Sequence, residues 1–154
     1  MDGAVAGCCA NMVGFAVLSF RENRWGGLVS QGIGTSMLQM GNIVKNPRIW
    51  LPAILTSAIT GPVATCLFRL EMNGPPVSAG MGTCGLVGQI GVWTGWLSPS
   101  ETALADGAVA IAPGVFEWTG LILISFVLPA VLCWAFGLLF RRMGWIREGD
   151  LKLN

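Results

Sequence analysis

Residues 29–38 read VSQGIGTSML, and residues 77–86 read VSAGMGTCGL. The two stretches share Val-Ser-x-Gly-x-Gly-Thr-x-x-Leu at an offset of 48 residues. At the same offset and without gaps, twelve identical pairs fall between residues 3–48 and 51–96. This is more than the composition alone would give, so we interpret the two segments as an internal repeat. Each unit consists of an apolar stretch followed by an uncharged, glycine-rich stretch.

The glycine-rich halves of the two units are not expected to form regular helices. Each glycine in a helix interior costs about 1 kcal/mol relative to alanine, and several lie close together here. Their density predicts broken or re-entrant backbone, which survives at membrane depth only where protein or a water-filled cavity surrounds it. Full spans that pack closely through their small residues are the alternative.

The composition indicates a protein whose solvent is largely lipid. Charged residues make up 11 % of the chain, against about 25 % in soluble domains. Hydrophobic residues make up 53 %, and the mean hydropathy is +0.66. Uncharged stretches at 3–20, 49–68 and 118–140 are long enough to predict membrane-spanning helices. We therefore expect one all-α integral membrane domain over residues 1–154.

The orientation of the two units depends on the glycine-rich stretches. If each stretch dips into the membrane and returns, the units are inverted repeats, as in many secondary transporters. If each stretch crosses fully, the units are parallel. Segment 98–117 is expected outside, and the basic tail 141–154 is expected in the cytoplasm. The re-entrant arrangement places Lys45 and Arg48 on the same side as the tail, so the charge count favours it.

The residue types exclude several kinds of chemistry. The chain contains no histidine, which removes the commonest general base and the commonest metal ligand. Its five cysteines show no CxxC spacing and are predicted to be small buried hydrophobes. We therefore expect no catalytic residue, metal site or cofactor in this chain. A net charge of +1 gives no indication of a nucleic-acid partner.

The glycine-rich stretches carry hydroxyl and amide side chains but no charge, which suits a small neutral solute such as a sugar or polyol. A dehydrated cation held on backbone carbonyls is the alternative. Trp93 could stack on a sugar ring or anchor the membrane interface, and Glu117 could line the pathway or be a solvated helix start. The candidate solute-binding residues are Gln31, Thr35, Ser36, Gln39, Thr83, Cys84, Gln89, Trp93 and Glu117.

Four stretches carry a family resemblance: QGIGTSMLQ at 31–39, NPRIW at 46–50, GMGTCGLVGQ at 80–89 and GWIREGD at 144–150. With them, nearly the whole chain resembles the second family of phosphotransferase-system membrane components. These are the EIIC-type sugar permeases, and the family also includes proteins described as putative toxin-gene regulators. The resemblance implies sugar uptake coupled to phosphorylation, in the bacterial inner membrane, together with soluble phosphotransferase components.

The chain resembles the C-terminal half of longer family members. This resemblance implies a partner that completes the pathway, either a second copy in a homo-oligomer or a separate N-terminal half. In such systems the phosphoryl group travels on His and Cys residues of separate soluble domains. We therefore expect this chain to be the permease part, with a non-transporting membrane regulator or sensor as the alternative.

Overall fold

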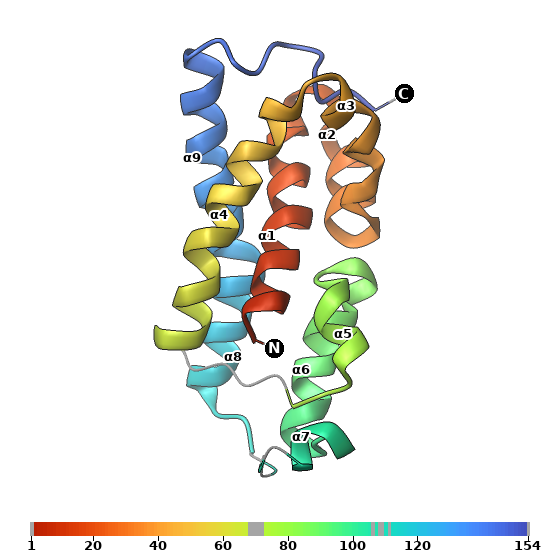
Figure 1. The fold of residues 1–154 in the computed structure, drawn as a ribbon, viewed down its shortest axis with the longest axis vertical. Helices are drawn as coiled ribbons and strands as arrows, with labels where there is room; N and C mark the ends of the chain where they lie inside the picture. Colours follow the sequence, from red (N-terminus) through yellow and green to blue (C-terminus); the bar gives the residue numbers. More distant parts are fainter. Residues whose placement is uncertain (1, 68–72, 106, 108–109, 111, 154) are drawn as a thin grey trace.

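The computed structural model describes residues 2–67, 73–105, 107, 110 and 112–153. The helices in these ranges are arranged around α1 (Asp2–Leu18), which packs against α4 (Leu51–Pro62) and α9 (Leu128–Arg142) (Figure 1). The residues of α1 that face these neighbours are small or apolar and almost fully buried, including Ala6, Ala10 and Phe15. The predicted all-helical class is confirmed.

Within the described ranges, two helical stretches are long and apolar enough to cross a membrane, Pro47–Leu67 and Val115–Arg142. They correspond to the spans predicted at 49–68 and 118–140. The third predicted span, 3–20, contains an apolar helix that is shorter, Gly3–Leu18. Its burial at the centre of the bundle explains its lack of charge as fully as contact with lipid would.

Both long stretches change pitch beside a proline. Proline has no N–H and crowds the preceding turn, so the regular hydrogen-bond ladder is interrupted there. A wider π-helical turn absorbs the interruption in each case. The segments in order are η3 (Pro47–Trp50), α4 and η4 (Val63–Leu67) around Pro62, and then α8 (Val115–Ile122), η6 (Leu123–Val127) and α9 beside Pro129.

The first glycine-rich stretch forms a helical hairpin, which we call the first hairpin (residues 20–45). It runs through α2 (Phe20–Val29) and η1 (Ser30–Gly34), reverses, and returns through η2 (Ser36–Gln39) and α3 (Met40–Lys45). The reversal occurs at Thr35, whose backbone is extended and whose hydroxyl accepts a hydrogen bond of 3.2 Å from the Met37 N–H. Both ends of the hairpin therefore lie at one end of the bundle (Figure 1).

The second glycine-rich stretch forms a second hairpin (residues 76–97) from α5 (Pro76–Met81), η5 (Cys84–Leu86) and α6 (Val87–Leu97). Its turn uses positive φ angles at Gly82 (55°), Gly85 (53°) and Leu86 (59°). It starts from the opposite end of the bundle, so the tips of the two hairpins face each other (Figure 1). Segments η1 and η5 are in contact at these tips, and the short helix α7 (Glu101–Ala105) follows.

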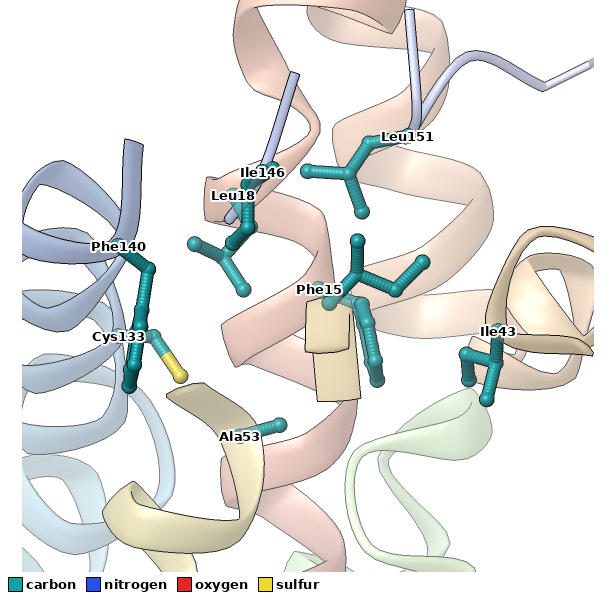
Figure 2. Packing of buried hydrophobic residues seen from close by; sticks show 9 residues of the cluster. Phe15, Leu18, Ile43, Ala53, Cys133, Phe140, Ile146 and Leu151 are labelled. Atoms are coloured by element: carbon teal, nitrogen blue, oxygen red, sulfur yellow. The ribbon is translucent and has the colours of Figure 1, made fainter. Parts of the chain in front are cut away.

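The C-terminal tail (residues 143–153) completes one of the two hydrophobic clusters that the described residues form. Ile146 and Leu151 are 3 % and 0 % exposed, although both belong to a segment without regular helix. Figure 2 shows how they reach the interior between α1, α9 and the first hairpin. The labelled members of this cluster are Phe15, Leu18, Ile43, Ala53, Cys133, Phe140, Ile146 and Leu151. The tail is therefore part of the packed domain.

Hydrogen bonds fasten the same tail to the first hairpin. The Leu151 N–H donates to Glu22 Oε2 (2.8 Å), and the Leu151 carbonyl accepts from Asn23 Nδ2 (2.7 Å) and Gln39 Nε2 (2.9 Å). Glu22 also forms an ion pair with Arg141 Nη2 at 3.1 Å. A single carboxylate thus connects α2, α9 and the tail.

Candidate functional site

A cavity of about 410 Å³ lies where the two hairpin tips meet α1. The residues that line it carry no charge, and most are apolar. This volume is in the range typical of small-molecule sites. The lining consists of Cys8, Asn11, Met12 and Phe15 from α1, of Thr35, Ser36, Met37, Met40, Ile43 and Trp50, and of Gly80, Met81 and Cys84.

The hydroxyl groups of Thr35 and Ser36 are the polar groups of this cavity that remain available. Thr35 accepts a hydrogen bond from Met37, but its hydroxyl hydrogen has no acceptor among the described residues. The Ser36 hydroxyl has no hydrogen-bond partner in the described parts of the chain. Both positions lie where the first hairpin reverses, so the irregular backbone presents two adjacent hydroxyls to one cavity.

Asn11 gives the cavity a fixed amide. Its Nδ2 donates to the Gly7 carbonyl (3.0 Å) and lies 3.4 Å from Ser57 Oγ, while its Oδ1 accepts from Trp50 Nε1 at 3.3 Å. The network ties α1 to α4 and orients the half-exposed Trp50 ring at the cavity wall. Trp50 is therefore held by a hydrogen bond as well as by packing.

Thr83 joins the two hairpin tips. Its side chain is fully buried, and its hydroxyl donates a short hydrogen bond to the Gly32 carbonyl of the first hairpin. Thr35 and Thr83 occupy equivalent positions in the two sequence units, yet one hydroxyl lines the cavity and the other fixes the contact between tips. The two threonines can therefore be separated experimentally.

The predicted glutamines lie outside the cavity lining, and Gln31 and Gln39 are fully buried. Gln31 Nε2 donates to Ser19 Oγ (2.7 Å), Gln89 Nε2 donates to Cys9 Sγ (3.2 Å), and Gln39 holds the tail. The Oε1 atoms of Gln31 and Gln89 are buried without a hydrogen-bond partner among the described residues. An unpaired buried acceptor costs about 1–3 kcal/mol. Each hairpin therefore keeps one amide oxygen able to accept a new hydrogen bond.

Trp93 and Glu117 lie in another part of the fold. The Trp93 ring is 6.4 Å from that of Trp118, which also contacts Trp96 edge-on at 5.8 Å. Glu117 Oε2 accepts a hydrogen bond of 2.9 Å from the Gly114 N–H and so caps α8. Of the predicted solute-binding residues, the structure brings Thr35, Ser36 and Cys84 together and leaves the other six outside the cavity.

Four methionines line the cavity without any signal in the sequence: Met12, Met37, Met40 and Met81. Met37 and Met40 are three residues apart, but Met12 and Met81 lie in other segments, and none of the four recurs at the repeat offset of 48. Methionine adapts its shape to irregular gaps, which suits a wall between three separate segments. Among the residues that the structure describes, no three His, Cys, Asp or Glu side chains gather in a group that could hold a metal ion.

Comparison with known proteins gives one match. A family model described as "Phosphotransferase system, EIIC" matches residues 1–153. Searches of the curated proteins and of the solved structures find no match. The family match covers nearly the whole chain and confirms the resemblance carried by the glycine-rich stretches. This protein is therefore a member of the phosphotransferase-system EIIC family, a family of membrane proteins.

Proposed function

We propose that this chain is the permease part of a phosphotransferase uptake system and binds a small neutral solute, most simply a sugar, between its two hairpin tips. The observation that carries the proposal is the pair of hydroxyl groups of Thr35 and Ser36 in an uncharged cavity, whose hydrogens have no acceptor among the described residues. Hydroxyl groups can both donate to and accept from a polyol, and an aromatic wall such as Trp50 can cover a sugar ring. The soluble components that carry the phosphoryl group are the expected partners.

We further propose that residues 3–48 and 51–96 are inverted repeats with re-entrant hairpins. The hairpins start from opposite ends of the bundle and meet through η1 and η5, which supports this arrangement (Figure 1). Arg21, Arg48 and Arg141 lie at the end that carries the tail, whereas the described residues at the opposite end, 73–75, 98–105 and 112–114, include no Lys or Arg. This asymmetry supports a multi-pass protein of the bacterial cell membrane with a cytoplasmic C-terminus.

The cavity needs a further protein surface to be complete. Met37 is 68 % exposed at its rim, and the hydroxyls of Thr35 and Ser36 would otherwise lie close to lipid. Polar groups and irregular backbone are stable at membrane depth only inside protein or in a water-filled cavity. A second copy or a separate N-terminal half is therefore part of the proposal.

Paired threonine variants test the solute site. Thr35→Val keeps the volume but removes the cavity hydroxyl, so it is expected to weaken solute binding about five- to tenfold, while the loss of its exposed hydrogen bond from the Met37 N–H lowers the unfolding temperature of the free protein only slightly. Thr83→Val removes the bond between tips and is expected to lower that temperature. A thermal-shift titration of the purified protein with sugars and polyols measures both effects.

Two results would contradict this assignment. One is unchanged affinity in both Thr35→Val and Ser36→Ala for a solute that stabilises the native chain. The other is the absence of any stabilising solute together with a co-purifying soluble partner, which would favour the regulator.

A further inference from the structure

A second cleft lies on the other side of α1, near the end that carries the tail. It has a volume of about 280 Å³ and separates the end of α1 and the start of α2 from α9. None of its residues lines the proposed solute cavity, so the two sites are independent. Its lining consists of Val17, Leu18, Phe20, Arg21, Trp25, Leu28, Trp134, Gly137, Leu138 and Arg141.

The body of this cleft is a narrow apolar slot with two exposed indole rings. Trp25 is 71 % exposed and Trp134 is 57 % exposed. Phe20 packs edge-on against Trp25 with ring centroids 5.5 Å apart, which forms one wall. On the other side, α9 approaches α1 so closely that a Cβ at Gly137 would collide with the Leu18 side chain. The cleft therefore presents aromatic and aliphatic side chains from α1, α2 and α9 to one apolar group.

The rim of the same cleft is basic. The exposed Arg21 has no ion-pair partner in the described parts of the chain. Arg141 uses Nη2 for both of its hydrogen bonds, to the Leu18 carbonyl (3.2 Å) and to Glu22 Oε1 (3.1 Å). Its remaining N–H groups have no acceptor among the described residues. With one carboxylate against two guanidinium groups, the rim keeps a net positive charge.

The backbone beside the slot is strained. Arg24, immediately before Trp25, has φ 49° and ψ −142°, a combination that residues other than glycine rarely adopt. Such conformations cost about 1–3 kcal/mol and cluster at ligand clamps, where the surrounding structure maintains them. Here the strained residue, Arg24, directly precedes Trp25, whose indole ring is largely exposed.

We propose that this cleft binds one anionic phospholipid. An acyl chain occupies the apolar slot between Trp25 and Trp134, and the phosphate lies at Arg21 and the free N–H groups of Arg141. The combination of an apolar slot and a cationic rim selects an amphipathic anion. Basic pockets between membrane helices are suited to lipid head groups of this kind. Tryptophan is also the residue enriched at the depth where head groups begin.

The test compares phosphatidylglycerol with phosphatidylcholine of the same acyl chains, each added to the detergent-purified full chain. Lipid occupancy by native mass spectrometry and the unfolding temperature are the readouts. We expect phosphatidylglycerol to bind more tightly, and Arg21→Gln to weaken its binding about fivefold, as expected for the loss of one cation at a head group. Arg142→Gln is the matched control, because Arg142 is exposed beside Arg141 but does not line the cleft.

A second variant tests the apolar slot. Trp134→Ala is expected to reduce the occupancy of both lipids, and its exposed position keeps the effect on folding small. Equal binding of the two lipids by the native chain would overturn the proposal, as would equal effects of Arg21→Gln and Arg142→Gln. The proposal would also be overturned if a second protein occupied this cleft and phosphatidylglycerol did not displace it. Thr35→Val should leave lipid binding unchanged, so the lipid and solute proposals fail separately.

Discussion

Gly82→Ala is expected to lower the unfolding temperature by roughly 10 °C, since a loss of about 3 kcal/mol shifts the midpoint by that amount in a protein of this size. Two costs combine. Gly82 has φ 55°, which strains any residue with a side chain. Its added Cβ would also lie 2.8 Å from Cys8 Cβ and 2.9 Å from the Cys8 carbonyl carbon, so the second hairpin would have to move away from α1.

The matched control is Gly34→Ala, the same substitution at the equivalent position of the first unit. Gly34 has no positive φ, and the nearest atom that an added Cβ would meet among the described residues, the Val29 carbonyl oxygen, is 4.0 Å away. Its unfolding temperature should stay close to that of the native chain or rise slightly. Thermal unfolding in detergent measures both variants. Equal destabilisation would contradict the claim that Gly82 is required for the close contact between the second hairpin and α1.

Glu22→Ala is expected to release the tail and to cost about 3 kcal/mol. The side chains of Glu22 and Arg141 are only 10 % and 14 % exposed, and removing one partner of a buried ion pair leaves the other charge uncompensated. The Leu151 N–H, which donates to Glu22 Oε2 at 2.8 Å, also loses its acceptor. Faster proteolytic cleavage within residues 143–153 and a lower unfolding temperature are the measurements.

Glu148→Ala is the control for the loss of a carboxylate in the same region, because Glu148 is exposed and has no ion pair within the described part of the chain. It should leave both measurements unchanged. The double variant Glu22→Ala/Arg141→Ala should be less destabilised than the sum of its single variants, because the unpaired charge is then absent. Additive effects would contradict a direct interaction between the two side chains.

The sequence predicts the helical class and the family because both depend on local properties. Charge-free stretches indicate helices in apolar surroundings. A high density of glycines indicates irregular backbone, which the structure has at η1, η2 and η5. The hydroxyls at Thr35 and Ser36 could be proposed because they lie where a helix must break. The helical class, the irregular backbone and the position of these hydroxyls all depend on residues that are close together in one segment of the sequence.

The rest depends on contacts between distant segments. Gln39 is as polar as Ser36, but its amide binds the Leu151 carbonyl 112 residues away, and no pattern in either segment indicates that pairing. Polarity shows that a buried side chain requires a partner without showing which one. The four methionines that line the cavity could not be predicted for the same reason, because Met12 and Met81 come together only when the second hairpin packs on α1.

The contact between the tail and the first hairpin also sets an order of events during synthesis. Asn23 and Leu151 are 128 residues apart, so at about 5–20 residues per second the ribosome adds Leu151 roughly 6 to 26 s after Asn23. Throughout that interval the carboxylate of Glu22 and the amides of Asn23 and Gln39 lack their final partner. The contact that joins the first hairpin to the tail can therefore form only after Leu151 has been synthesised, and a nascent chain stalled before Leu151 would enter the membrane without these hydrogen bonds.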